Sequence, residues 1–183
     1  MFPVARWLIP VVLAGLCGCG EDDDPDCEAL SDEPPTLVLG GTTSGLDAFV
    51  TLEDGDDLEV IINPKGLYTL PPSLRIGALY PGQSGRVEDD RDPEVAIRAY
   101  RGEEYVGGTD VSVEDGTALP APPHYGFAAT AGGGELIAVP VVFLDGLDVL
   151  SYLNQRVTLR ATVTDACGRS ARDQLDVVVF WQY

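Results

Sequence analysis

The sequence predicts an all-β domain, an antiparallel immunoglobulin-like sandwich of seven to nine strands. Three observations support this prediction. Short apolar segments recur at spacings of roughly 8–15 residues, turn-forming residues separate them, and no long helical period follows the N-terminal segment. At most one short helix is expected outside that segment.

The chain begins with a segment of the secretory type. One positive charge, Arg6, precedes an apolar run from Trp7 to Gly18. This run of about a dozen residues is too short to cross a hydrocarbon core of roughly 30 Å as a helix. A positive start, a short apolar middle and small residues at the end are typical of a signal peptide.

The end of this segment carries a second signal. Residues 16–19 (LCGC) resemble the bacterial lipobox, in which Leu precedes a small residue and Cys follows the cut. The resemblance implies cleavage after Gly18 and acylation of Cys19 by chains such as palmitate. Cys17 is the poorer candidate because the bulky Leu16 directly precedes it. The alternatives are an ordinary secreted protein cut nearby and an uncleaved anchor.

Three parts are therefore expected: a signal peptide over 1–18, an acidic tether over 19–35 and one β-sandwich domain over 36–183. Residues 20–35 contain eight acidic residues and three prolines, so they cannot bury enough apolar surface to fold alone. Like charges keep such a segment extended. Gly20, rather than Asp, follows Cys19. By resemblance to the enterobacterial sorting rule, this implies the outer membrane of a Gram-negative bacterium rather than the inner membrane.

The net charge limits the possible partners. The chain has 30 acidic and 11 basic residues, and loss of Arg6 with the signal leaves ten basic residues and a net charge of −20. Nucleic acid is excluded because phosphate binding needs clustered Lys and Arg. Direct adsorption to an anionic membrane surface is disfavoured as well. Membrane attachment would therefore come from the acyl chains on Cys19.

Two cysteines remain for the folded part, Cys27 and Cys167. Exported proteins meet oxidising conditions, so these two are a candidate disulfide, with two free thiols as the alternative. A loop of about 140 residues would be stabilised by about 4–5 kcal/mol in the chain-entropy model. Neither cysteine has a neighbour at metal-ligand spacing.

The strands are expected in the following order. Those before residue 116 cover residues 36–40 (short and edge-like), 48–52, 58–62, 73–79, 95–100 and 109–113. Residues 116–134 are expected to be the least ordered part of the domain. Residues 135–144 indicate a strand buried on both faces, in which Pro140 marks a bulge or an edge. One or two helical turns are expected within 145–153.

The end of the chain has the clearest β pattern. In residues 156–164, Val157, Leu159, Ala161 and Val163 alternate with polar side chains such as Arg160. Residues 173–180 repeat this alternation after a turn. The two segments are predicted to be neighbouring core strands.

Several of these features occur together in a known group. The lipobox, the acidic linker and Cys27 accompany residues 52–56 (LEDGD), 63–66 (NPKG), 73–76 (SLRI) and 163–170 (VTDACGRS). This combination resembles predicted lipoproteins of large-genome Gram-negative soil bacteria, which have no assigned activity. The last motif also resembles the final hairpin of bacterial immunoglobulin-like modules. The resemblance implies no functional residue beyond the lipid-bearing Cys19.

No catalytic apparatus or cofactor site is predicted. His124 is the only histidine, and no Gly-x-Ser-x-Gly motif is present. Residues 132–134 are three glycines without the Lys and Ser/Thr of a phosphate-binding loop, and they indicate a flexible turn. A hydrolase with paired carboxylates is the remaining enzymatic alternative.

Calcium binding is a second, weaker possibility because hard cations need only clustered oxygens. The acidic segments 53–57 and 88–94 could supply them, but neither has EF-hand spacing. Solvated turns are the simpler interpretation. The candidate ligands are Asp54, Asp56, Asp57, Asp89, Asp90 and Asp92.

The expected function is that of a lipid-anchored cell-envelope protein. Its immunoglobulin-like domain would act without catalysis in adhesion, display or envelope assembly, with a protein or carbohydrate partner at the cell surface. A surface lipoprotein that binds carbohydrate or calcium is the alternative.

Overall fold

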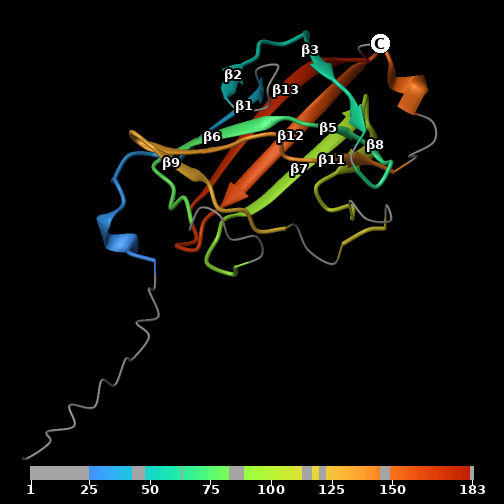
Figure 1. Ribbon diagram of the computed structural model, residues 1–183. Coiled ribbons are helices and arrows are strands. Elements are labelled where there is room, and N and C mark those ends of the chain that lie inside the picture. Colours follow the sequence, from blue (N-terminus) through green and yellow to red (C-terminus); the bar gives the residue numbers. More distant parts are fainter. Residues whose placement is uncertain are drawn as a thin grey trace, which may run out of the picture.

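A computed structural model describes residues 25–42, 48–62, 64–82, 89–112, 117–119, 123–144 and 149–181. The predicted signal peptide and Cys19 lie outside these residues. The described chain forms two packed β-sheets and two short 3-10 helices (Figure 1), which confirms the all-β sandwich. Within these ranges, no helix is long and apolar enough to cross a membrane.

The first sheet is entirely antiparallel, with strand order β2-β1-β6-β10-β9. β1 lies between β2 and β6, so it is an inner strand and not the edge-like strand that its sequence suggested. The five strands are β1 (Thr36–Thr42), β2 (Phe49–Thr51), β6 (Ser73–Gly77), β9 (Ala128–Thr130) and β10 (Gly133–Leu136).

The second sheet has the strand order β3-β13-β12-β7-β8-β11-β5-β4. β3 runs parallel to β13, and the other neighbours are antiparallel. The eight strands are β3 (Asp56–Glu59), β4 (Ile61–Ile62), β5 (Tyr68–Leu70), β7 (Glu94–Arg101), β8 (Glu104–Gly108), β11 (Val141–Phe143), β12 (Arg156–Thr164) and β13 (Ser170–Phe180).

The arrangement is immunoglobulin-like. The order β1-β6-β10-β9 corresponds to strands A-B-E-D of that fold, and β13-β12-β7 corresponds to G-F-C. The described residues contain 13 strands rather than seven to nine. The excess comes from short segments such as β2, β4, β5 and β11, which have two or three residues each. Segments of this length show no alternation in sequence.

The core follows the predicted alternation. The segments 156–164 and 173–180 are confirmed as neighbouring strands, because β12 pairs with β13 along its whole length. β12 pairs with β7 on its other side. The inward-facing side chains of the three strands are almost fully buried: Val95, Ile97, Ala99, Val157, Leu159, Ala161, Val163, Ala171, Leu175, Val177 and Val179.

Two expected strands are each divided by the structure. Residues 135–144 were expected to form one strand, but β10 belongs to the first sheet and β11 to the second. Ala138 has a positive φ of 55° and Pro140 has no N–H to donate, so the chain leaves one sheet and enters the other between them. Residues 58–62 are likewise divided into β3 and β4, at opposite edges of the second sheet.

The expected strand at 109–113 is absent from its described part. Thr109 turns inward instead, and its hydroxyl accepts from Ile97 N and donates to Val95 O, both at 3.0 Å. Val111 makes an isolated bridge to Ala118. The expected helical turns are confirmed as the 3-10 helix η2 (Val149–Tyr152).

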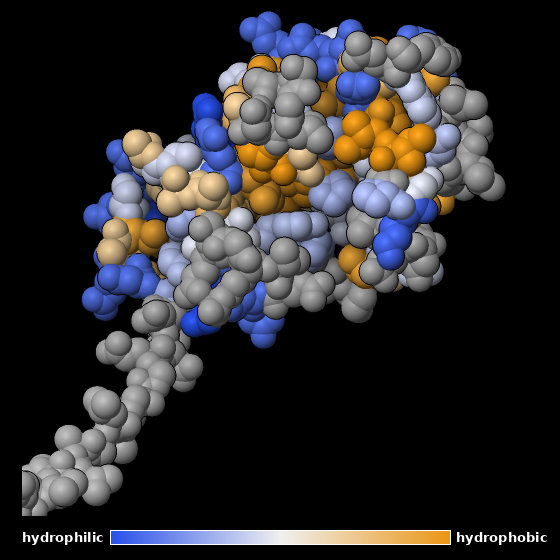
Figure 2. Space-filling view, viewed as in Figure 1, coloured by the Kyte–Doolittle hydropathy of each residue, from blue (hydrophilic) through white to orange (hydrophobic). Residues whose placement is uncertain are grey.

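Both edges of the second sheet are unsuited to pairing with another chain. β3 exposes Asp56 and Asp57, and charge discourages edge association. β4 has only two residues, although its Ile62 is half exposed. On the face seen in Figure 2, hydrophobic residues gather beside β5, and hydrophilic residues lie along part of their margin.

The three glycines at 132–134 form more than the flexible turn that was expected. Gly132 has a φ of 98° and makes the turn, but Gly133 and Gly134 belong to β10. A Cβ built on Gly133 would overlap the backbone oxygen of Ile76 in β6. The absence of a side chain therefore allows these two strands to pair.

Replacement of Gly133 by alanine is expected to lower the free energy of unfolding by about 1–3 kcal/mol, because backbone must move to admit the methyl group. Urea unfolding measures this loss. Gly41→Ala in the same sheet is the matched control, since its Cβ would meet only the end of the flexible Leu52 side chain, at 3.2 Å. Equal unfolding midpoints for the two variants would contradict this explanation.

Candidate functional site

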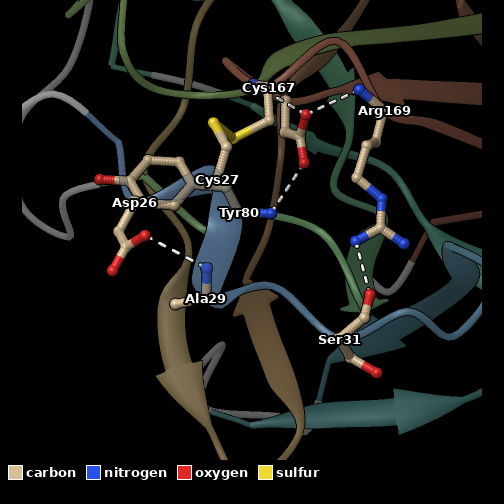
Figure 3. Close-up of a disulfide and its surroundings, with 8 residues drawn as sticks. Asp26, Cys27, Ala29, Ser31, Tyr80, Cys167 and Arg169 are labelled. Atoms are coloured by element: carbon tan, nitrogen blue, oxygen red, sulfur yellow. Dashed lines mark hydrogen bonds between the residues drawn. A yellow bond between two sulfur atoms is a disulfide. The ribbon is translucent and has the colours of Figure 1, made fainter.

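The first candidate site is the junction between the domain and residues 25–35, which we call the N-terminal arm. A disulfide joins Cys27 to Cys167, with a Cα–Cα distance of 5.6 Å and 140 residues between them in sequence, as predicted (Figure 3). The short 3-10 helix η1 (Cys27–Ala29) begins at the first of these cysteines. The carboxylate of Asp26 caps this helix by accepting from Ala29 N at 3.1 Å.

The turn that presents Cys167 is organised by Asp165. This residue is only 5% exposed. Its Oδ1 accepts from the backbone N–H groups of Cys167 and Arg169, at 3.0 and 2.8 Å. Its Oδ2 accepts from Tyr80 N at 2.9 Å (Figure 3), so one carboxylate satisfies three backbone donors.

Arg169 completes the junction. Its guanidinium donates to the backbone oxygens of Ser31, at 2.9 Å, and Glu33, at 2.6 Å. Asp165, Cys167 and Arg169 all belong to the VTDACGRS motif. The motif therefore forms the attachment point of the arm, and it fixes the place at which the predicted tether leaves the domain.

Replacement of Asp165 by alanine is expected to lower the free energy of unfolding by about 3 kcal/mol. The change leaves three backbone donors without their acceptor, and hydrogen bonds to charged groups contribute about 1.5–3 kcal/mol each without being additive. Urea unfolding of the oxidised protein measures the effect. Asp32→Ala, on the exposed arm, removes the same charge and serves as control. Indistinguishable stabilities would show that Asp165 does not hold the turn.

The predicted calcium ligands do not converge. Within the described ranges, no group of three or more His, Cys, Asp or Glu residues could hold a metal ion. Asp54 accepts from Asp176 N at 3.0 Å, and Asp56 accepts from Glu53 N at 2.8 Å. Asp89 pairs with the Arg91 guanidinium at 2.9 Å. Of the other candidates, Asp57 and Asp90 are exposed and Asp92 is buried.

His124 has a structural position. Its Nδ1 lies 2.8 Å from the backbone oxygen of Asp92, and its backbone bridges to Glu94 at the start of β7. The side chain is half-buried. His124 therefore holds the loop around it against the second sheet.

The second candidate site lies on the outer side of the second sheet. A hollow of about 940 Å³ is lined by residues of β7, β12 and β13. Three exposed arginines dominate it, in a chain where acidic residues outnumber basic residues by 30 to 11. We call this surface the arginine face, and it consists of Arg98, Tyr100, Arg160, Thr162, Arg172 and Gln174.

Strand register places these side chains next to one another. Arg160 lies opposite Arg98 on one side and opposite Gln174 on the other. Thr162, two residues further along β12 and on the same face, lies opposite Arg172. Residues directly opposite have Cβ atoms about 4.5–5.5 Å apart, and diagonal neighbours are about 7–8 Å apart. The three guanidinium groups therefore share one small area.

The arginines have few anionic partners. Arg98 Nε donates to Asp110 Oδ2 at 3.2 Å. Arg160 Nε donates to the neutral Gln174 Oε1 at 3.1 Å, and its guanidinium lies 4.6 Å from the Tyr100 ring centroid. The Arg172 side chain makes no hydrogen bond or ion pair with any residue that the structure describes.

Asp110 also organises the margin of this surface. Its Oδ1 accepts from the Tyr105 hydroxyl at 2.5 Å. Burial and this hydrogen bond raise the pKa of Tyr105 well above its ordinary value, so the phenol stays neutral. Burial acts to lower the pKa of Arg98. The charge and hydrogen bonding of Asp110 act in the opposite direction and are stronger together, so the pKa of Arg98 is raised. Arg98 is a permanent cation.

Two other carboxylates line the hollow, Glu94 and Asp173. Asp173 is occupied within the fold, because Oδ2 accepts from Leu39 N at 2.7 Å and Oδ1 from Gln174 N at 2.8 Å. It joins β13 to the first sheet. Glu94 is the first residue of β7, lies opposite Thr164 and places a negative charge at the margin of the surface.

The sequence predicted the outward position of some residues of the arginine face. Alternation placed Arg98, Tyr100, Arg160 and Thr162 on the outward side of their strands. It did not show that the strands lie side by side, and Arg172 fell before the expected start of the last strand. No family model matches the chain, and no curated protein matches its sequence.

Proposed function

We propose that the protein is a lipid-anchored cell-envelope protein. Acyl chains on Cys19 would hold it in the outer membrane of a Gram-negative bacterium. Its immunoglobulin-like domain would act without catalysis in adhesion, display or envelope assembly.

The observation that carries this proposal is the covalent junction between Cys27 and Cys167. Cys27 follows Cys19 by only eight residues. The disulfide passes any load on the tether to the turn between β12 and β13, which pair over nine positions in the centre of the core. Without it, the load would reach β1 first and could peel that strand from the sheet. A domain that works while attached to a membrane benefits from such a connection.

A second candidate function, ligand binding at the cell surface, is favoured by the arginine face. Calcium is not favoured as that ligand, because the described acidic turns do not assemble a ligand set. Carbohydrate is the favoured ligand, because the arginine face presents hydroxyl, amide and guanidinium groups.

The proposal is tested by expressing the full chain in a Gram-negative host fed with an alkyne-bearing fatty acid. The inner and outer membranes are then separated on a density gradient. We expect labelled protein in the outer-membrane fraction. Labelled protein confined to the inner membrane would contradict the destination, and unlabelled soluble protein would contradict the anchor.

A further inference from the structure

We infer that the arginine face binds a carboxylate-bearing polysaccharide, by pairing its guanidinium groups with the carboxylates of successive sugar units. This inference deepens the proposed function, because it names the class of partner that an anchored envelope domain would meet. It rests on charge, strand register and the chemistry of the lining residues.

The charge of this surface is unlike that of the rest of the chain. With 30 acidic and 11 basic residues, carboxylates are abundant enough to neutralise every arginine. Arg172 nevertheless has no ionic partner among the described residues, and Arg160 has only an amide and an aromatic ring. Arg75, by comparison, pairs with Glu135 at 2.7 Å on the first sheet. The arginine face therefore offers unneutralised cations to an external anion.

Strand register adds an energetic reason. Arg98 and Arg160 stand directly opposite each other on β7 and β12, and like charges in this position destabilise a sheet. Asp110, at the margin, compensates only one of them. An anion placed between the guanidinium groups would remove this repulsion and gain charge-assisted, bidentate hydrogen bonds.

The position of the surface argues against a peptide partner. β12, the central strand of this surface, pairs with β13 on one side and with β7 on the other, so it cannot add an extra strand from a peptide. The lining also lacks the apolar pockets that anchor protein partners, since Ala96 and Ala161 are its only aliphatic residues. The hydroxyl, amide and guanidinium groups of the arginine face suit a ligand composed of hydroxyls and carboxylates. Of the two carboxylates that also line the hollow, Asp173 accepts hydrogen bonds within the fold, and Glu94 lies at the margin.

The test uses the full-length protein, purified from membranes in non-ionic detergent, and three immobilised polymers. These are polygalacturonate as the acidic polysaccharide, dextran as the neutral polysaccharide and poly-L-glutamate as the acidic peptide. Biolayer interferometry gives the apparent Kd. The variant Arg160→Gln/Arg172→Gln removes two charges from the arginine face. Lys65→Gln/Arg75→Gln removes two charges from elsewhere and is the matched control.

We expect the parent protein to bind polygalacturonate and not dextran, in spite of its net negative charge. The Arg160→Gln/Arg172→Gln variant should bind at least about tenfold more weakly, since each lost charge-assisted contact is worth that factor or more. The control should bind like the parent, and both variants should remain folded at the temperature of the binding assay. Binding should weaken as salt is raised.

The inference is overturned if the parent does not bind polygalacturonate, or if both double variants lose binding equally. Binding to poly-L-glutamate as tight as binding to polygalacturonate would also overturn it, in favour of an acidic peptide. The mass of the purified protein separates this inference from the proposed function. Acylated protein that fails to bind refutes only the arginine face, and unacylated protein that binds refutes only the anchor.

Discussion

Replacement of Cys19 by alanine is expected to release the protein from the membrane almost completely. Each buried methylene of an acyl chain contributes about 0.8 kcal/mol to membrane binding, and one such chain gives only reversible attachment. The predicted mature chain, with a net charge of −20, would be repelled by an anionic bilayer, so charge would not replace the lost acyl chains. Detergent phase partitioning should move the protein from the detergent phase to the aqueous phase.

Cys17→Ala is the matched control for this experiment. It removes a cysteine two residues earlier, in the part of the chain that the signal peptidase would discard. We expect this variant to be labelled by fatty acid and to stay in the detergent phase. The reverse result, with Cys17→Ala released and Cys19→Ala retained, would show that Cys17 and not Cys19 carries the acyl chain.

Removal of the disulfide by Cys27→Ser/Cys167→Ser is expected to lower the free energy of unfolding by about 4 kcal/mol. The bridge closes a loop with a sequence separation of 140 residues, and constraint of the unfolded chain by so long a loop is worth about 4–5 kcal/mol before any strain. For a domain of this size, the loss corresponds to a fall in Tm of about 8–16 °C. Differential scanning calorimetry measures this shift.

A reducing agent provides the control. It should lower the Tm of the parent protein to that of the double serine variant and leave the variant unchanged. A parent Tm that is indifferent to the reductant, together with two titratable thiols in the unfolded oxidised protein, would show that Cys27 and Cys167 are not bonded.

Sequence patterns predicted the centre of the fold best. β12 alternates strictly between apolar and polar residues, and β7 and β13 do so at most positions, because one face of each strand lies on the core. The disulfide could be predicted for a different reason. After the assignment of Cys17 to the signal and Cys19 to the lipid, only two cysteines remained to pair.

Other elements depend on tertiary contacts, which the local sequence pattern does not indicate. The move of the chain from the first sheet to the second at Ala138 and Pro140 required the tertiary structure, because residues 136–144 are apolar throughout. The division of residues 58–62 between opposite sheet edges is of the same kind. β5, β8 and β9, with three to five residues, were too short or too rich in glycine to be recognised.

The arginine face shows where sequence reasoning ends. Arg98 and Arg160 could each be placed on the outward side of a strand, but they are separated by 62 positions and meet only through the β7–β12 register. A surface assembled from three strands requires that register. The junction is different, since Asp165, Cys167 and Arg169 lie in one short motif. Its role in attaching the N-terminal arm follows from the disulfide to Cys27 and the hydrogen bonds of Arg169 to the arm.

Mass spectrometry of the N-terminal peptide, taken from the protein isolated from bacterial membranes, tests the central claim most directly. The account predicts a mature chain that begins at Cys19 and carries fatty acyl groups on that residue. A mature chain that begins elsewhere, or one in which Cys19 is present without any acyl group, would contradict it.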